Sequence, residues 1–189
     1  MSFRYEIRLS GEGGQGLVLA GKILAEAAAI YDELNATQSQ SYGPEARGGA
    51  SRSEVIISDE DIDYPKAVHI DLMLCLTQES LDRYHTDVKE GGIIIVDSQA
   101  VTRFPETQAC EIIPVPIIDL ARDKVGKTLV ANIVALGIIA GLLDLISVQA
   151  LQQAIEARVP KGTEDLNRKA FQIGLEAAKD IREHTKHKE

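Results

Sequence analysis

A glycine-rich segment near the amino end has residue types and spacing that suit the binding of an anion. It has the pattern G-x-G-x-x-G and lies between a strand pattern and a helix pattern. Glycine permits positive φ values and lets a ligand approach the backbone closely. The helix that follows offers free N–H groups and its positive dipole end to a phosphate or another anion. The pattern predicts an anion-binding turn made of Gly11, Gly13, Gly14, Gln15 and Gly16; a turn that needs glycine only for packing is the alternative.

Two common nucleotide ligands do not fit this turn. Binding of NAD calls for an acidic residue at the end of the second strand, but residues 35–40 contain no carboxylate, and Asp32 and Glu33 precede that strand. The spacing of Gly16 to Lys22 imitates a P-loop, yet the next residue is isoleucine where a magnesium-binding Ser or Thr is required. We therefore predict neither an NAD site nor an NTPase.

A second segment, residues 38–53, is rich in glycine, serine and arginine, and it is expected to be a long loop between two strands. Long functional loops usually lie over the carboxyl ends of strands, near ligands. Arginine can hold a phosphate or a carboxylate through paired N–H groups, and tyrosine offers a stacking face with a polar tip. The segment adds Tyr42, Arg47, Gly48, Gly49 and Arg52 to the predicted binding site; a solvated surface loop is the alternative.

Other residues with chemical potential receive structural interpretations. Cys75 and Cys110 stand alone in apolar runs, so we predict no iron–sulfur cluster and no metal site on this chain. His69 and His85 have no carboxylate or second histidine at ligand spacing, and we interpret them as surface or satisfied histidines. Asp97 either faces a ligand crevice at the end of its strand or caps the next turn. No catalytic residue is assigned.

Strand and helix patterns alternate along the chain, which favours an α/β fold. We predict one domain over residues 1–189, with a doubly wound, mainly parallel, Rossmann-like sheet and C-terminal helices. The expected strands cover residues 5–9, 35–39, 54–57, 71–76, 93–96 and 111–115, and the last lies at an edge because it contains a proline. The expected helices cover residues 17–30, 78–84, 128–145, 148–157 and 164–182.

Composition excludes several classes of protein. The 189 residues carry 20 Lys and Arg against 29 Asp and Glu, a formal charge of −9, which disfavours sequence-independent nucleic-acid binding. The amino end lacks the apolar region of a secretory signal. Residues 129–143 carry no charge, but a membrane-spanning helix needs about 20 apolar residues. We expect a cytoplasmic protein that contacts no membrane, with 129–143 as a core or interface helix.

Taken in order, the motifs resemble a known family. The resemblance is carried by Gly11-x-Gly13-Gly14-Gln15-Gly16, Ser41-Tyr42-Gly43-Pro44-Glu45-x-Arg47-Gly48-Gly49, Ser53-x-Val55-Ile56-Ile57-Ser58, Ile62-Asp63-Tyr64-Pro65, the strand from Asp71, and Lys161-Gly162-Thr163-x-x-Leu166-Asn167-x-x-Ala170-Phe171. Each piece is modest by itself, whereas the order and spacing of the set are specific. The chain is similar over nearly its whole length to the gamma subunits of 2-oxoacid:ferredoxin oxidoreductases, above all those of the 2-oxoglutarate type.

The resemblance implies a place in a heteromeric complex that oxidatively decarboxylates a 2-oxoacid to acyl-CoA, CO2 and reduced ferredoxin. Thiamine diphosphate, magnesium and iron–sulfur clusters would belong to partner subunits, ferredoxin would meet the complex, and coenzyme A could contact this chain. The chain would serve in assembly and coenzyme A handling and would be inactive alone. Its sequence agrees, since it has no thiamine motif and no cysteine cluster. The alternatives are the corresponding subunit of an indolepyruvate ferredoxin oxidoreductase, a stand-alone nucleotide-binding regulator, or a scaffold without a ligand.

Overall fold

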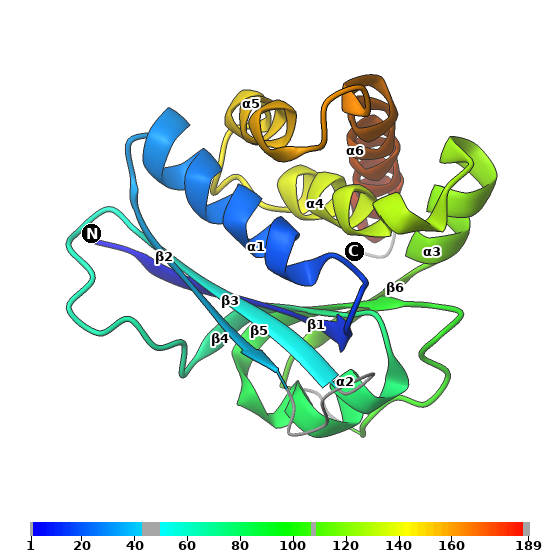
Figure 1. The fold of residues 1–189 in the computed structure, drawn as a ribbon. Coiled ribbons are helices and arrows are strands. Elements are labelled where there is room, and N and C mark those ends of the chain that lie inside the picture. The colour runs from blue at the N-terminus through cyan, green and yellow to red at the C-terminus, as the bar shows by residue number, and fades with distance from the viewer. Residues whose placement is uncertain (1, 43–49, 107–108, 187–189) are drawn as a thin grey trace.

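A central six-stranded sheet organises the protein, whose computed structural model describes residues 2–42, 50–106 and 109–186. The strand order is β2-β3-β1-β4-β5-β6 (Figure 1). The strands are β1 (Arg4–Glu12), β2 (Asn35–Tyr42), β3 (Ala50–Ser58), β4 (Ile70–Cys75), β5 (Val88–Asp97) and β6 (Glu111–Val115). Strands β1, β4, β5 and β6 run parallel, whereas β3 runs antiparallel to both of its neighbours. The predicted α/β fold with a mainly parallel sheet is confirmed.

Most of the segment expected as a long loop is an antiparallel hairpin. Strand β2 extends to Tyr42 and β3 resumes at Ala50, so only residues 43–49 separate them, and these lie outside the described residues. We expected a loop over residues 38–53 because the polar side chains there have weak strand propensity. This expectation was wrong. Continuous backbone pairing with neighbouring strands, from Asn35 opposite Ser58 to Tyr42 opposite Ser51, determines the conformation instead.

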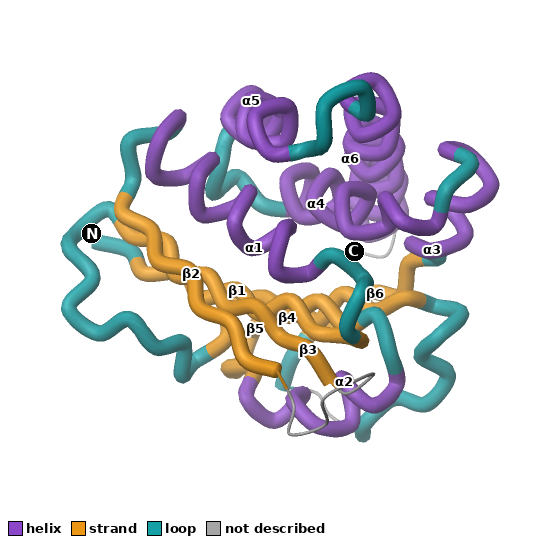
Figure 2. The backbone as a smooth tube through the Cα atoms, in the orientation of Figure 1, coloured by secondary structure: helices purple, strands orange, loops and turns teal. Residues whose placement is uncertain are grey.

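The helices cover both faces of the sheet unequally. The upper layer in Figures 1 and 2 holds α1, α4, α5 and α6, while α2 lies on the other side. The helices are α1 (Leu17–Glu26, continued by a π-helical turn, Ala27–Tyr31), α2 (Gln78–Tyr84, then a 3₁₀ turn, His85–Asp87), α3 (Ile117–Leu120, continued by Ala121–Val125), α4 (Ala131–Leu142, after a 3₁₀ turn, Thr128–Val130), α5 (Val148–Arg158) and α6 (Glu164–Lys186). The expected helix over 128–145 therefore ends three residues early, because Leu143 is extended.

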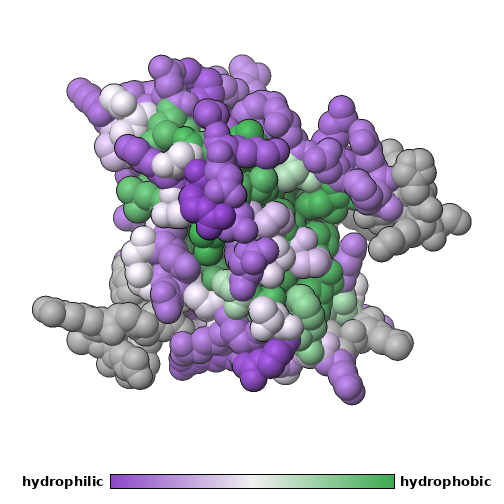
Figure 3. All heavy atoms as spheres, turned by 90° about the vertical axis from the view of Figure 1, so that its right-hand side faces the viewer, coloured by the Kyte–Doolittle hydropathy of each residue, from purple (hydrophilic) through white to green (hydrophobic). Residues whose placement is uncertain are grey.

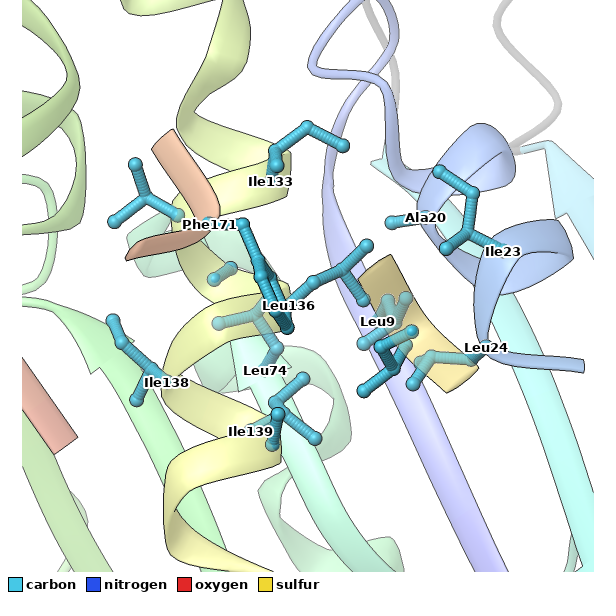
Figure 4. Close-up of a cluster of buried hydrophobic side chains, with 14 of the residues drawn as sticks. Leu9, Ala20, Ile23, Leu24, Leu74, Ile133, Leu136, Ile138, Ile139 and Phe171 are labelled. Carbon is cyan, nitrogen blue, oxygen red and sulfur yellow. The ribbon is translucent and has the colours of Figure 1, made fainter. Parts of the chain in front are cut away.

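The main core lies between the sheet and the upper helices. Figure 4 shows Leu9 and Leu74 from the sheet facing Leu136 of α4, with Ile23 of α1 and Phe171 of α6 on either side. All five side chains are buried. Burial on every side explains why α4 is apolar all round. None of the described helices combines the length and the apolar character that crossing a membrane requires.

Helices α4 and α6 cross at backbone contact. A Cβ atom at Gly137 would lie 2.2 Å from the Phe171 carbonyl oxygen, and one at Gly174 would lie 2.1 Å from the Val134 carbonyl oxygen. Only glycine permits so close an approach, so Gly137 and Gly174 allow the two helices to cross at this distance.

The two edges of the sheet differ in character. Strand β6 forms one edge, as its proline predicted, and β2 forms the other. Beside β6, a hollow of about 340 Å³ separates the strand from α6 and is lined in part by Ile112, Pro114 and Ile181. Figure 3 looks at the molecule from this side and shows apolar side chains gathered across the middle of the face. Strand β2, by contrast, contains only uncharged residues, most of them polar.

Candidate functional site

The glycine-rich turn links β1 to α1 at the carboxyl end of β1, as predicted. Gly14 and Gly16 have φ values of +92° and +73°, a region that favours glycine. The side chain of Gln15 closes the turn, since its Oε1 accepts the Glu12 N–H at 2.7 Å. Within the described part of the chain, the N–H groups of Gly13, Gly14 and Gly16 donate no hydrogen bond. The turn therefore presents free donors at the start of α1, where the helix dipole adds positive potential.

Two of the glycines allow the turn to pack tightly. A Cβ atom at Gly11, inside β1, would lie 2.2 Å from Gln15 Oε1 and 3.2 Å from Leu76 Cβ. A Cβ atom at Gly16 would lie 2.5 Å from Nδ2 of Asn132, which donates to the Gly16 carbonyl oxygen at 3.1 Å. Asn132 was not among the residues predicted for the site. Its only signal was an amide side chain inside the uncharged run 129–143, and that signal does not reveal the partner.

Beside the turn lies a hollow of about 360 Å³, here called the glycine-turn hollow. It is lined by Gly14, Gln15, Leu76, Ile118, Thr128, Leu129 and Ala131. Gly14, Gln15 and Leu76 follow the carboxyl ends of β1 and β4. Ile118 lies in α3 after β6, and the other three residues lie at or just before the start of α4. The connection after β1 leads through α1 to β2 on one side of the sheet, and the connection after β4 leads to β5 on the other. Ligands of open α/β sheets bind at such a point of divergence.

The chemistry of the glycine-turn hollow suits a ligand with an anionic group and an apolar part. Two helices, α1 and α4, begin at its wall, and their amino ends favour negative charge. Leu76, Ile118 and Leu129 supply apolar surface, and Leu129 is 73% exposed. Among the described residues that line the hollow, none is a lysine or an arginine, and the attraction for an anion comes from backbone dipoles.

Arg52 lies on the opposite face of the sheet from α1. Its neighbour Ser53 faces α1, because a Cβ atom at Gly21 of that helix would lie 2.1 Å from Ser53 Oγ. Side chains alternate along a strand, so Arg52 points away. Its guanidinium carbon is 5.5 Å from the centre of the Tyr84 ring, and its Nε is 3.8 Å from a Glu54 oxygen. The structure thus does not bring Arg52 to the face on which α1 begins.

The remaining predicted residues belong to the hairpin between β2 and β3. Arg47, Gly48 and Gly49 lie outside the described residues. The backbone of Tyr42 pairs with Ser51, and Ala50 pairs with Glu12 at the start of the glycine-rich turn. Strands β2 and β3 therefore extend to the same end of the sheet as the glycine-rich turn.

A buried arginine on the α2 face was missed by sequence analysis. Arg8 is 4% exposed; its Nη2 is 2.7 Å from a Glu54 carboxylate oxygen, and it also pairs with Asp87. Its guanidinium lies 5.1 Å from the centre of the Tyr84 ring. The sequence signal for Arg8 was a charged residue with apolar neighbours in a predicted strand. Because every charged partner comes from another strand or turn, we interpret the cluster as structural.

Structural roles explain three other residues that could have done chemistry, namely Asp97, Cys75 and His85. The Asp97 carboxylate is buried and accepts the N–H groups of Gln99 and Ala100 at 3.0 and 2.9 Å, so it caps the turn after β5. Burial raises the pKa of the Cys75 thiol to about 11, which keeps it protonated near neutral pH. His85 Nδ1 is 3.0 Å from the Leu81 carbonyl oxygen. Across the described ranges, no group of His, Cys, Asp and Glu side chains is arranged to hold a metal ion.

The sequence of the chain is similar to those of known proteins over most of its length. Residues 6–177 match the pyruvate ferredoxin/flavodoxin oxidoreductase family. The chain is 48% identical over 183 residues to the 2-oxoglutarate synthase subunit KorC of Methanocaldococcus jannaschii, covering 96% of this chain and 97% of the relative. An indolepyruvate oxidoreductase subunit, IorB of Archaeoglobus fulgidus, is more distant, with 25% identity over 194 residues.

Solved structures show the same similarity. The gamma subunit of a keto/oxoacid ferredoxin oxidoreductase from Geobacter sulfurreducens superimposes with a TM-score of 0.86 and 53% identity, covering 93% of this chain and 97% of that one. The 2-oxoglutarate:ferredoxin oxidoreductase of Magnetococcus marinus, solved with 2-oxoglutarate, coenzyme A and succinyl-CoA bound, superimposes with a TM-score of 0.83 at 22% identity. There the match covers 94% of this chain but 31% of the longer one, and it shows the shared fold alone.

Proposed function

The chain belongs to the pyruvate ferredoxin/flavodoxin oxidoreductase family, and on that basis we propose that it is the gamma subunit of a 2-oxoglutarate:ferredoxin oxidoreductase. The observation that carries the proposal is 48% identity to a 2-oxoglutarate synthase subunit over 97% of that subunit's length. The complex oxidatively decarboxylates the 2-oxoacid to acyl-CoA and CO2 and passes the electrons to ferredoxin. Residues 1–189 act in it as a single domain.

We assign the redox centres to partner subunits. Iron–sulfur clusters are held mainly by four cysteine thiolates, and this chain has two cysteines in all. Cys75 is buried in the sheet, and Cys110 directly precedes β6. The clusters therefore belong to other subunits, and we assign thiamine diphosphate and magnesium to them as well, because this sequence has no thiamine motif. Those subunits are this chain's partners in the cytoplasm, and ferredoxin docks on the assembled complex.

Isolation of the chain from its native lysate tests the subunit assignment. A gamma subunit brings thiamine-binding and iron–sulfur subunits with it, and the complex reduces ferredoxin with 2-oxoglutarate and coenzyme A. A homogeneous monomer or homodimer without companions would instead indicate a stand-alone nucleotide-binding regulator. Preference for indolepyruvate over 2-oxoglutarate in the purified complex would favour the other subunit type, which the 25% identity makes the weaker candidate.

Coenzyme A handling is the role that we propose for the glycine-turn hollow. Coenzyme A combines phosphate groups with a long arm that ends in a thiol. The free N–H groups of Gly13, Gly14 and Gly16 suit a phosphate oxygen, and the apolar wall at Leu76 and Leu129 suits the arm. Since no lysine or arginine is among the described residues that line the hollow, a partner subunit or Arg47, in the hairpin that also carries Tyr42, Gly48 and Gly49, would supply further positive charge. When bound, the coenzyme supplies the thiol that accepts the acyl group.

Substitution at Gly13 tests this role, because a Cβ atom there has no heavy atom within 4 Å and the side chain fits without strain. Gly13→Asp places a negative charge beside the amides and is expected to raise the KM for coenzyme A about 10-fold in the reconstituted complex. Gly13→Asn has the same size without the charge and is expected to raise it less. Unchanged kinetics in both variants would remove the coenzyme A proposal and leave the subunit assignment intact.

A further inference from the structure

A buried asparagine joins the glycine-rich turn to α4. Asn132 is 4% exposed in a helix otherwise built from apolar and small residues. Burial of an amide side chain is unfavourable unless it is hydrogen-bonded. Its Nδ2 donates to the Gly16 carbonyl oxygen at 3.1 Å, across 116 residues of sequence. The contact therefore compensates the cost of placing a polar side chain in this helix.

The Gly16 carbonyl oxygen accepts two hydrogen bonds and is held from two directions. Besides Asn132, the N–H of Ala20 in the first turn of α1 donates to it at 3.0 Å. A peptide unit is planar, and its C=O and N–H point in opposite directions. Fixing the Gly16 carbonyl therefore also fixes the N–H of Leu17, the first residue of α1, on the opposite side of that peptide. Within the described chain, this N–H has no acceptor.

The same bond joins two walls of the glycine-turn hollow. Gly14 and Gln15 form one wall, and Thr128, Leu129 and Ala131, which come directly before Asn132, form another. Gly16 adopts a left-handed conformation, and the side chain of Asn132 occupies the space that a Cβ atom would need. Asn132 thus contacts the turn at one of its two residues with positive φ.

We propose that Asn132 is the positioning residue of the anion site. It holds the Gly16–Leu17 peptide, and with it the Leu17 N–H and the end of the turn, in one orientation relative to the hollow. Binding sites gain affinity when their donors are oriented before the ligand arrives, because less ordering is needed on binding. The inference rests on the proposed coenzyme A role and adds the residue that determines the geometry of the donors.

The experiment compares Asn132→Leu with Asn167→Leu. Asn167 is a matched control, because it is 6% exposed, donates through its own Nδ2 to the Thr163 carbonyl oxygen at 2.9 Å, and does not line the hollow. In the reconstituted complex, Asn132→Leu is expected to raise the KM for coenzyme A about 5- to 10-fold while kcat stays within about 2-fold. In hydrogen–deuterium exchange of the same complex, the segment that contains Gly16 and Leu17 is expected to exchange faster. Asn167→Leu is expected to change neither.

The outcomes separate this inference from the proposed function. If Asn132→Leu and Asn167→Leu alter the KM for coenzyme A equally, the effect is general destabilisation and the positioning role is refuted. If Gly13→Asp raises that KM and Asn132→Leu does not, the coenzyme A site stands and Asn132 has no positioning role in it. If the segment exchanges faster while neither the Gly13 nor the Asn132 variants change the KM, Asn132 orders the turn but the ligand is not coenzyme A, and the inference fails with the function on which it rests.

Discussion

The Asp97 carboxylate accepts the N–H of Ile118 at 2.9 Å and so ties the end of β5 to the start of α3. Its other oxygen accepts two N–H groups of the turn that follows β5, and the side chain is completely buried. Ile118 also lines the glycine-turn hollow. The hydrogen bond between Asp97 and Ile118 therefore fixes the position of an apolar residue in the wall of the candidate site.

Replacement of Asp97 by asparagine is expected to destabilise the protein. The amide has one acceptor oxygen in place of two, and its NH₂ group would face a backbone donor. We expect a loss of about 2–4 kcal/mol in the free energy of unfolding, measured by urea denaturation. Asp123→Asn is the control, since that exposed carboxylate only pairs with Arg122 at the surface. Equal stability of the two variants would contradict the capping role of Asp97.

Gly16 is expected to tolerate no side chain. Its φ of +73° is costly for alanine, and the new Cβ would meet Asn132 Nδ2 at 2.5 Å. Gly16→Ala should lower the free energy of unfolding by about 2 kcal/mol or more. Gly13→Ala, whose Cβ meets nothing within 4 Å, should remain within about 0.5 kcal/mol of the wild type. Thermal denaturation of both variants measures the difference, and similar melting temperatures would show that the turn can rearrange.

The crossing of α4 and α6 is expected to depend on Gly174. An alanine Cβ there would lie 2.1 Å from the Val134 carbonyl oxygen, which forces the two helices apart. We expect Gly174→Ala to cost about 2–4 kcal/mol, although alanine is the better helix former. Lys169→Ala changes an exposed position of the same helix and should have little effect. Chemical denaturation distinguishes the two, and a stabilised Gly174→Ala variant would disprove the close crossing.

Stability at alkaline pH is expected to reflect Cys75. Burial raises the pKa of its thiol to about 11, while an unfolded thiol titrates near 8.5. Above pH 8.5 the unfolded chain loses this proton and the folded chain keeps it, so stability falls by up to about 1.4 kcal/mol per pH unit until pH 11. Cys75→Ala should remove this fall, so that the free energy of unfolding depends less on pH, most clearly between about pH 9 and pH 10.

Tyr5 offers the comparison for that measurement. Burial and the nearby Asp71 carboxylate raise the pKa of its hydroxyl from 10.0 to about 12. Its contribution to stability is therefore complete below about pH 10 and is lost between 10 and 12. Tyr5→Phe should change the slope only in that higher range. Urea denaturation at several pH values measures both slopes, and a Cys75→Ala variant with the wild-type slope near pH 9.5 would contradict the assignment.

Much of the fold follows from local patterns. Apolar runs predicted β4 and the second half of β5, and Pro114 predicted that β6 lies at an edge. The hairpin could not be predicted in the same way, because β2 and the start of β3 are polar and owe their conformation to pairing with distant strands. Local propensity does not describe such pairing.

The site was predictable in part. The turn from Gly11 to Gly16 stood where its spacing placed it, between a strand and a helix. The orientation of Arg52 could have been predicted. Side chains alternate along a strand, Val55 and Ile57 face the core, and Arg52 therefore falls on the other face. The contact of Asn132 with Gly16 was not accessible, because no local pattern relates residues 116 positions apart.

The polar strand β2 has a practical consequence for anyone who prepares this subunit by itself. Eight residues long, without a lysine, a proline or a break in its pairing with β3, it leaves a row of backbone donors and acceptors open along the margin of the sheet. Such margins invite strands of other molecules to add on, and natural proteins usually protect them. Production together with its companion chains is therefore the safer route to soluble material, and filamentous precipitates are the hazard of making it alone.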